Sequence, residues 1–290
     1  MSFQQARRHA ARVFLFASIL FTAGCATQAR KPLPEGTLPV AGTLPVEVYV
    51  GQQELLIESQ STNPMAAGGG LLGALIVTAI DNSAAKKDEA RMSAIRDLLV
   101  GEDVTGYVVE QVRTGLDPAR FGRTLDLELV PETVEARLAR QAMPSRDGVL
   151  MISAKYALTY DMRALRVSFD TAFGDRVVKG KRITRKSVFS SRVEYLVPLP
   201  GDSAKDKEDA RAAKWAAQGR EYLIAQIRAG FATAIAMLNH DIAADVAANR
   251  STQKVKYAYG ALATGSGRVE RESDGRRWVR VTPALLVSVP

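Results

Sequence analysis

Apolar and polar positions in the first half of the chain alternate between helical and strand periods. The stretch 45–51 alternates apolar and polar residues, which predicts a strand. Apolar residues then recur with helical spacing over 81–99 and again over 104–116, so two helices are expected there. Strict alternation over 124–130 predicts a second strand, and a short helical pattern follows over 134–142.

The middle of the chain has the period of strands. Residues 148–160, 165–173 and 187–197 each place large apolar residues at every second position, which predicts three half-buried strands. Gly174-Asp175 is the expected turn after the second of them. Short connections between successive strands favour an antiparallel meander, and a single apolar face means that helices cover one side only.

Residues 202–245 carry the strongest helical pattern in the chain. Apolar side chains from Trp215 to Ile242 follow a 3.6-residue period, so one long helix is expected to pack on the strands. Ser203 and Asp206 have the spacing of a capping pair at its start.

The C-terminal segment returns to strands. Asp274-Gly275 is a favoured two-residue hairpin turn, and this register places Glu272 opposite Arg277 and Arg271 opposite Trp278. The last six residues, LLVSVP, are expected to form a closing strand.

These elements predict an α+β fold. It would consist of an antiparallel or mixed sheet, the long 202–245 helix packed on one face, and an N-terminal helical segment, within one globular domain over 47–290. An alternating α/β unit over 47–147, with a division of the domain near 147, is the alternative.

The N-terminal 24 residues have the three parts of a secretory signal peptide. Arg7, Arg8 and Arg12 precede an apolar run over 13–23, which is too short to span a membrane. Small residues then lead to Cys25, the single cysteine of the chain. Residues 1–24 are therefore expected to be removed on export.

Thr22-Ala23-Gly24-Cys25 resembles the lipobox of bacterial lipoproteins, although Thr22 stands where leucine is usual. The resemblance implies cleavage between Gly24 and Cys25 and lipidation of Cys25. It also implies sorting to the periplasmic side of the outer membrane, because Ala26 is not the aspartate that retains such proteins in the inner membrane. The overall layout is similar to that of uncharacterised periplasmic lipoproteins of Gram-negative bacteria.

Residues 25–46 are expected to tether the domain to the lipid. The segment contains four prolines, and the five residues GTLPV occur twice, at 36–40 and 42–46. Such proline spacing favours an extended chain. Pairing of part of the repeat as an edge strand is the alternative.

A glycine-rich apolar run over 66–80 has only Thr78 as a polar side chain. Its fifteen residues are too few for a membrane span. The run is expected to be a turn that leads into a buried helix. The alternative is a segment that inserts into a membrane or contacts a partner, as in a subunit of a membrane-associated or secretion complex.

Positive charge is concentrated in one stretch. The whole chain has 39 basic and 31 acidic residues, and removal of the three signal-peptide arginines leaves a charge of +5. This mild excess favours anionic envelope surfaces and does not indicate nucleic acid. Between 176 and 192 there are seven basic residues and no acid, which makes the stretch either a solvated hairpin tip or a contact for an anionic surface or partner. The seven are Arg176, Lys179, Lys181, Arg182, Arg185, Lys186 and Arg192.

Residues for catalysis are scarce. The exported chain has one histidine, His240, which we expect to be exposed on the long helix, and its cysteine is used for lipid. Zinc sites, cofactor sites and cysteine chemistry are therefore not expected. Gly265-Ser266-Gly267 reads as a loop before the C-terminal hairpin. Four carboxylates in or near the strands are the only other candidates, and they are interpreted as turn residues: Asp161, Asp170, Asp175 and Glu194.

The sequence therefore predicts a non-enzymatic lipoprotein that binds another envelope component in assembly, transport or envelope integrity. The partners would be the membrane, through the lipid anchor, and an envelope protein or anionic polymer. A carboxylate-dependent envelope hydrolase is the remaining alternative.

Overall fold

A computed structural model describes residues 42–50, 54–58, 82–120, 124–131, 146–179, 182–243, 253–259 and 263–290. Four α-helices and a ten-stranded mixed sheet make up this part of the chain, so the predicted α+β class is confirmed. The helices are α3 (Asn82–Asp97), α4 (Val104–Gly115), α6 (Glu208–Ala217) and α7 (Gly219–Ala243). The strands are β1 (Thr43–Val50), β2 (Leu56–Ile57), β3 (Thr124–Pro131), β4 (Arg146–Leu158), β5 (Ala164–Lys179), β6 (Arg182–Pro198), β7 (Lys254–Ala258), β8 (Thr264–Ser273), β9 (Arg276–Thr282) and β10 (Leu285–Val289).

One sheet runs through the whole domain. Its order is β3-β1-β4-β5-β6-β10-β9-β8-β7, and β2 pairs with β4. Strands β1, β3 and β4 are parallel and belong to a segment that contains α3 and α4, which is the connectivity of the alternating α/β alternative. However, β4 pairs with both β1 and the antiparallel β5, so the sheet continues without a break across residue 147.

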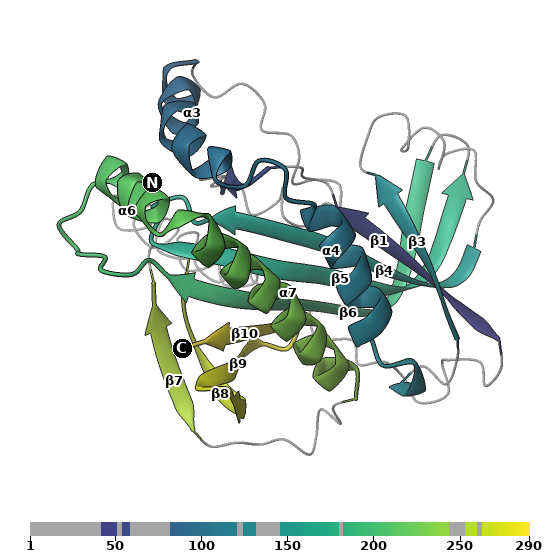
Figure 1. Ribbon diagram of the computed structural model, residues 1–290. Helices are drawn as coiled ribbons and strands as arrows, with labels where there is room; N and C mark the ends of the chain where they lie inside the picture. Colours follow the sequence, from purple (N-terminus) through teal and green to yellow (C-terminus); the bar gives the residue numbers. More distant parts are fainter. Residues whose placement is uncertain are drawn as a thin grey trace, which may run out of the picture.

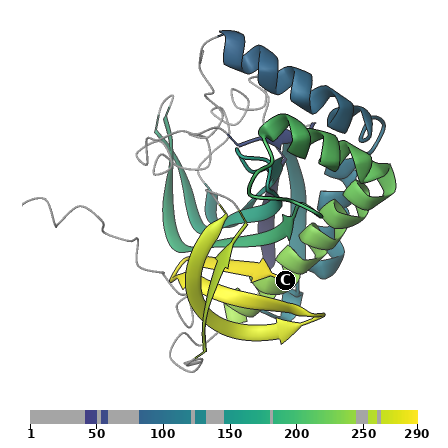
Figure 2. The same cartoon turned by 90° about the vertical axis from the view of Figure 1, so that its left-hand side faces the viewer.

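The described helices lie on one face of this sheet, the inner face (Figures 1 and 2). The main core fills the space between that face and helices α4 and α7. Phe231 of α7, which is fully buried, packs against Tyr156 and Phe169 of the central strands. The apolar faces expected from the two-residue period are therefore the ones that α7 covers.

Helix α7 crosses β5 and β6 at Gly230. A Cβ atom at this position would lie 2.7 Å from Val167 Cγ2 and 3.1 Å from Tyr195 Cδ1. Because β-branched Val167 is fully buried, it has little freedom to move aside. The missing side chain therefore sets how closely the helix approaches the sheet.

Gly230→Ala is expected to lower the free energy of unfolding by about 1–3 kcal/mol, because the added methyl group overpacks the helix–sheet contact. At an open helical position the same substitution would instead stabilise the protein by about 1 kcal/mol. Urea unfolding of the two proteins measures the difference, and a stabilised variant would contradict the close approach.

Several predicted boundaries are wrong. The long helix is two helices, because the chain turns at Gly219 with φ +80° between α6 and α7. Helix α6 begins only at Glu208, so Ser203 and Asp206 close a preceding turn. Strand β1 begins at Thr43, inside the predicted tether, and lies between β3 and β4 with Leu44 fully buried.

Two predicted turns are also strand. At Gly174-Asp175 the β5–β6 pairing shifts register by a bulge and then continues to Lys179 and Arg182. Residues 265–267 belong to β8, where Gly267 has no room for a Cβ beside the Arg280 carbonyl, 2.2 Å away. The C-terminal hairpin is confirmed, with Glu272 opposite Arg277 and positive φ angles at Asp274 and Gly275.

Candidate functional site

The basic stretch forms the far part of the β5–β6 hairpin. We call residues 174–187 the basic hairpin; its register places Arg176 opposite Arg185 and Lys179 opposite Arg182. The bulge between Phe173 and Gly174 separates it from the rest of the two strands, and bulges bend the strands that contain them. Figures 1 and 2 show this part of the hairpin turning away from the helical layer.

Like charges directly opposite each other destabilise a pair of strands. The basic hairpin has two such pairs, whereas Asp175, the one acid of this segment, is in register with Lys186. Asp175 also accepts a hydrogen bond from the Gly148 amide at 3.2 Å. The register of the basic hairpin therefore concentrates positive charge, and like charges in opposite positions weaken the pairing of its two strands. Lys181 lies outside the described residues.

Arg192 does not belong to this group. It lies ten residues along β6 from Arg182, roughly 33 Å at 3.3 Å per residue, and its partners are acidic. Its Nε atom is 2.7 Å from Glu194 Oε1 and 3.7 Å from Asp170 Oδ1. Arg192 is therefore a member of an ion network and not a free cation of the basic hairpin.

This outer-face ion network lies on the sheet face opposite the described helices. Arg166 is 2.7 Å from Glu58 and 3.3 Å from Glu194, and Lys155 is 3.5 Å from Asp170. Three acids and three bases thus balance one another. The members are Glu58, Lys155, Arg166, Asp170, Arg192 and Glu194.

Burial and neighbouring charges together shift the pKa values in and beside the outer-face ion network. Desolvation raises the pKa of the Glu58 carboxyl, and the nearby Arg166 charge opposes that shift. The negative charge of Glu194 raises the pKa of the Arg192 guanidinium. Burial and then the charge of Glu194 raise the pKa of Tyr257 to about 12. Asp170 and Glu194, two of the carboxylates considered for hydrolysis, therefore converge on Arg192, and both are ion-paired.

The expectation that His240 is exposed is wrong. Its side chain is 17% exposed, its Nε2 atom lies 3.3 Å from Glu270 Oε2, and its ring packs edge-on against Trp278. Arg280 donates to Glu270 at 2.9 Å and to Asp241. The Ser191 hydroxyl donates to Asp241 as well. We call the polar members the helix-end network, because they attach the last turns of α7 to β6, β8 and β9. The five members are Ser191, His240, Asp241, Glu270 and Arg280.

Sequence reasoning missed the helix-end network because its members are far apart in the chain. Serine, histidine and two carboxylates resemble a catalytic set, but Ser191 contacts Asp241 and not His240. Ser191 and Asp241 are at most 4% exposed, so solvent and substrate do not reach the hydroxyl. An acid near the C-terminus of a helix opposes the helix dipole, and this was the one signal in the sequence that Asp241 has a cationic partner.

The helix-end network makes stability depend on pH. Desolvation would raise the pKa of Glu270, but hydrogen bonds from His240 and Arg280 and their charges lower it to about 2 from 4.5. A lowered pKa stabilises the fold above pH 4.5, and this contribution is lost as the pH falls toward 2.

Glu270→Gln is therefore expected to unfold more easily than the wild type at pH 6, by about 2–3 kcal/mol. The difference between the two proteins should shrink steadily between pH 4.5 and pH 2. Urea unfolding at stepped pH measures it, with Glu110→Gln, an exposed acid of α4, as the control. A difference that stays constant with pH would contradict the role of the carboxylate charge.

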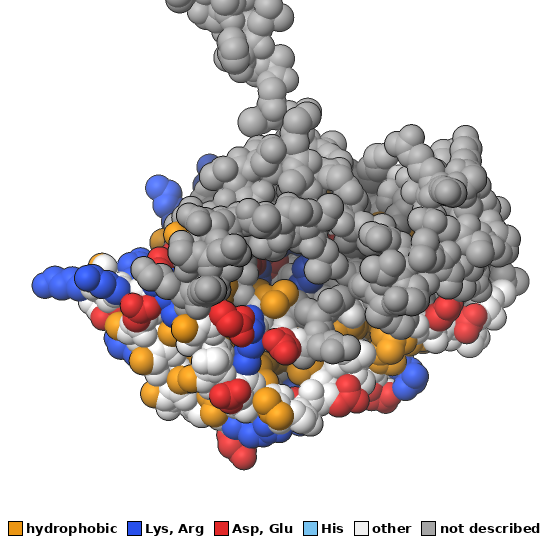
Figure 3. Space-filling model, turned by 90° about the horizontal axis from the view of Figure 1, so that it is seen from above, with side chains coloured by type: hydrophobic (Ala, Val, Ile, Leu, Met, Phe, Trp, Pro, Cys, Tyr) orange, Lys and Arg blue, Asp and Glu red, His pale blue; other side chains and the backbone are white. Residues whose placement is uncertain are grey.

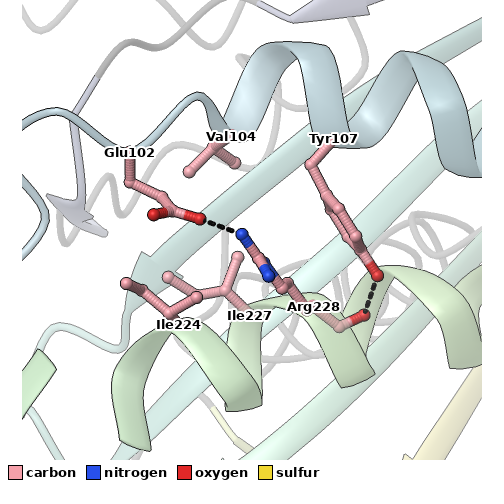
Figure 4. A pocket seen from close by; sticks show the side chains of 6 residues that line it. All are labelled: Glu102, Val104, Tyr107, Ile224, Ile227 and Arg228. Carbon is pink, nitrogen blue, oxygen red and sulfur yellow. Dashed lines mark hydrogen bonds and ion pairs between the residues drawn. The ribbon is translucent and has the colours of Figure 1, made fainter. Parts of the chain in front are cut away.

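A small hollow lies between α4 and α7 (Figure 4). Its cavity volume is about 10 Å³, far below the roughly 300–1,000 Å³ of ligand pockets, and Val104, Ile224 and Ile227 make its apolar wall. Glu102 pairs with Arg228 across it, and the Tyr107 hydroxyl donates to the Arg228 carbonyl at 3.1 Å. These contacts join the start of α4 to α7. The hollow is therefore a gap in the packing of the two helices and not a ligand pocket.

Within the described part of the chain, no group of three or more His, Cys, Asp or Glu side chains could hold a metal ion. No family model matches this chain. No curated protein matches it either. Seen from above Figure 1, the described surface carries interspersed acidic, basic and apolar side chains (Figure 3).

The predicted export features lie outside the described residues. These are Gly24 and Cys25 and the tether up to residue 41, and the apolar run 66–80 lies outside the described residues as well. The short helix over 134–142 is outside them too. Among the described helices none is long and apolar enough to cross a membrane.

Proposed function

We propose that this protein is a non-enzymatic lipoprotein on the periplasmic side of the outer membrane, and that its basic hairpin binds a phosphate-bearing envelope surface. The observation that carries the proposal is the register of the basic hairpin, with Arg176 opposite Arg185 and Lys179 opposite Arg182. An anion bound between such pairs removes their repulsion and forms charge-assisted hydrogen bonds with both members. Anion binding therefore relieves the repulsion that destabilises the free hairpin.

The remaining charges support a binding role over catalysis. Asp170 and Glu194 are held by Arg192, and Glu270 is held by Arg280 and His240. These carboxylates are occupied by partners of the same chain. The basic hairpin is different, because its positive charges exceed the acids in register with them. It also turns away from the helical layer (Figure 2).

Binding to vesicles tests the proposal. The Cys25→Ser chain, which cannot be lipidated, should bind phosphatidylglycerol vesicles and not phosphatidylcholine vesicles, and its affinity should fall with added salt. Replacing Lys179, Lys181, Arg182, Arg185 and Lys186 by glutamine should weaken binding by more than about a hundredfold, at about 1 kcal/mol for each charge. The control replaces five basic residues elsewhere: Lys205, Lys207, Arg268, Arg271 and Arg277. Equal losses in both variants would point to net charge alone and would contradict a site on the basic hairpin.

The lipid anchor has its own test. Cys25→Ser should allow high salt to extract the protein from the membrane fraction of cells into the soluble fraction, because the acyl chains that give stable attachment are then missing. If the variant stays in the membrane fraction and is still retained in high salt, lipidation of Cys25 is not what holds it.

A further inference from the structure

Strand β3 forms one edge of the sheet. Along all eight of its residues it pairs with β1, from Thr43 opposite Thr124 to Val50 opposite Pro131, and on its other side it pairs with no described strand. Such an edge presents backbone N–H and C=O groups that can pair with an added strand.

The two edges of the sheet differ in how they are protected. Strand β7, at the opposite edge, carries Lys254 and Lys256, and lysine on an edge strand prevents pairing with other chains. Strand β3 has neither lysine nor an internal proline, and Leu129 is 41% exposed, which is unusual among the large apolar side chains of the described residues. The β3 edge is therefore the less protected one.

The side chains of β3 indicate what would pair with it. Asp126 and Glu128 are exposed and share the outer face, while Leu125, Leu127 and Leu129 share the inner face. A symmetric antiparallel pair of two β3 strands centred on Leu127 would place Asp126 opposite Glu128, which is unfavourable. An incoming strand with lysine or arginine at alternate positions would instead form two favourable cross-strand pairs.

We propose that the β3 edge binds an extended segment of a partner protein that alternates basic and apolar residues, and adds it to the sheet as a further strand. The basic side chains pair with Asp126 and Glu128, and the apolar ones extend the row of Leu125, Leu127 and Leu129. This site is separate from the basic hairpin and has the opposite charge, so the protein would join a basic partner segment to an anionic surface.

A pair of synthetic peptides tests this inference. Labelled ten-residue peptides of alternating Lys and Val, or of alternating Glu and Val, are titrated with the full chain and followed by fluorescence anisotropy. Lys179, Lys181, Arg182, Arg185 and Lys186 are replaced by glutamine in this chain, so that the Glu peptide does not bind the basic hairpin. The Lys peptide should bind and slow amide hydrogen exchange in residues 124–130. The Asp126→Lys/Glu128→Lys variant should bind the Lys peptide at least about tenfold more weakly and the Glu peptide more tightly.

The matched control is Asp97→Lys/Glu221→Lys, which makes the same change of charge at two exposed helical positions and should leave binding unchanged. Slower amide hydrogen exchange in the wild-type protein tests the proposal even if a variant fails to fold. Equal binding of both peptides, or protection outside β3, would overturn the proposal. Sedimentation compares the wild type with the Asp126→Lys/Glu128→Lys variant. If the wild type is a dimer and the variant is a monomer, the edge binds a second copy of this chain, which would overturn the choice of partner.

Discussion

Arg166→Met should lower the free energy of unfolding by about 3–5 kcal/mol, because it removes the cation that pairs with Glu58 and one of the two cations beside Glu194. Arg166 is 11% exposed and lies between Glu58 and Glu194, at 2.7 and 3.3 Å. Methionine keeps most of the side-chain volume, so the loss reports the charge and not a cavity. Chemical unfolding in urea measures it.

Two further variants make the Arg166 prediction specific. Arg113→Met removes an exposed pair with Glu110 and should cost less than about 1 kcal/mol. Adding Glu58→Gln to Arg166→Met should recover part of the stability, because the carboxylate that Arg166 compensated is then neutral, while Glu194 keeps its pair with Arg192. If the double variant is no more stable than the single one, the outer-face ion network is not held together by charge.

Asp241→Ala should cost a similar amount, about 3–5 kcal/mol, because it removes one of the two carboxylates that pair with the largely buried Arg280 and leaves the Ser191 hydroxyl without its acceptor. The side chain of Asp241 is fully buried and accepts from both Arg280 and Ser191. Removing it also weakens the attachment of α7 to β6 and β9. Far-UV circular dichroism during urea unfolding follows the loss.

Helix α3 supplies the control, since Asp97 is an exposed acid at its C-terminal end. Asp97→Ala should change stability by less than about 0.5 kcal/mol. A double-mutant cycle of Asp241→Ala with Arg280→Met should give a coupling energy of about 1–3 kcal/mol. Additive losses would show that the two side chains act independently, contrary to the helix-end network.

Periodicity predicted most elements of the described fold, but it missed β2 and β7 and several element limits. Met92, Ile95, Val108 and Val112 are buried as the helical spacing predicts. The break at Gly219 escaped because the apolar period continues through it, whereas the turn depends on one positive φ angle. The parallel pairing of β1 with β3 and β4 depends on long-range contacts, which a local pattern does not contain.

The candidate site was predicted unevenly for the same reason. The basic stretch was visible as a run of charge, but the register that sets Arg176 opposite Arg185 follows from a bulge that sequence reasoning took for a turn. Arg192 seemed to belong to the run until strand pairing brought Asp170 beside it. The helix-end network joins residues from 191 to 280, so no local motif announced it.

Photo-crosslinking in intact cells tests the central claim, a basic hairpin that contacts the envelope, most directly. A photoreactive amino acid is placed at position 184 in the basic hairpin and, in a second protein, at position 272 in the C-terminal hairpin. We predict a discrete crosslinked envelope component from position 184 alone, lost when Lys179, Lys181, Arg182, Arg185 and Lys186 are neutralised. The same products from both positions, or none from position 184, would contradict a binding role for the basic hairpin.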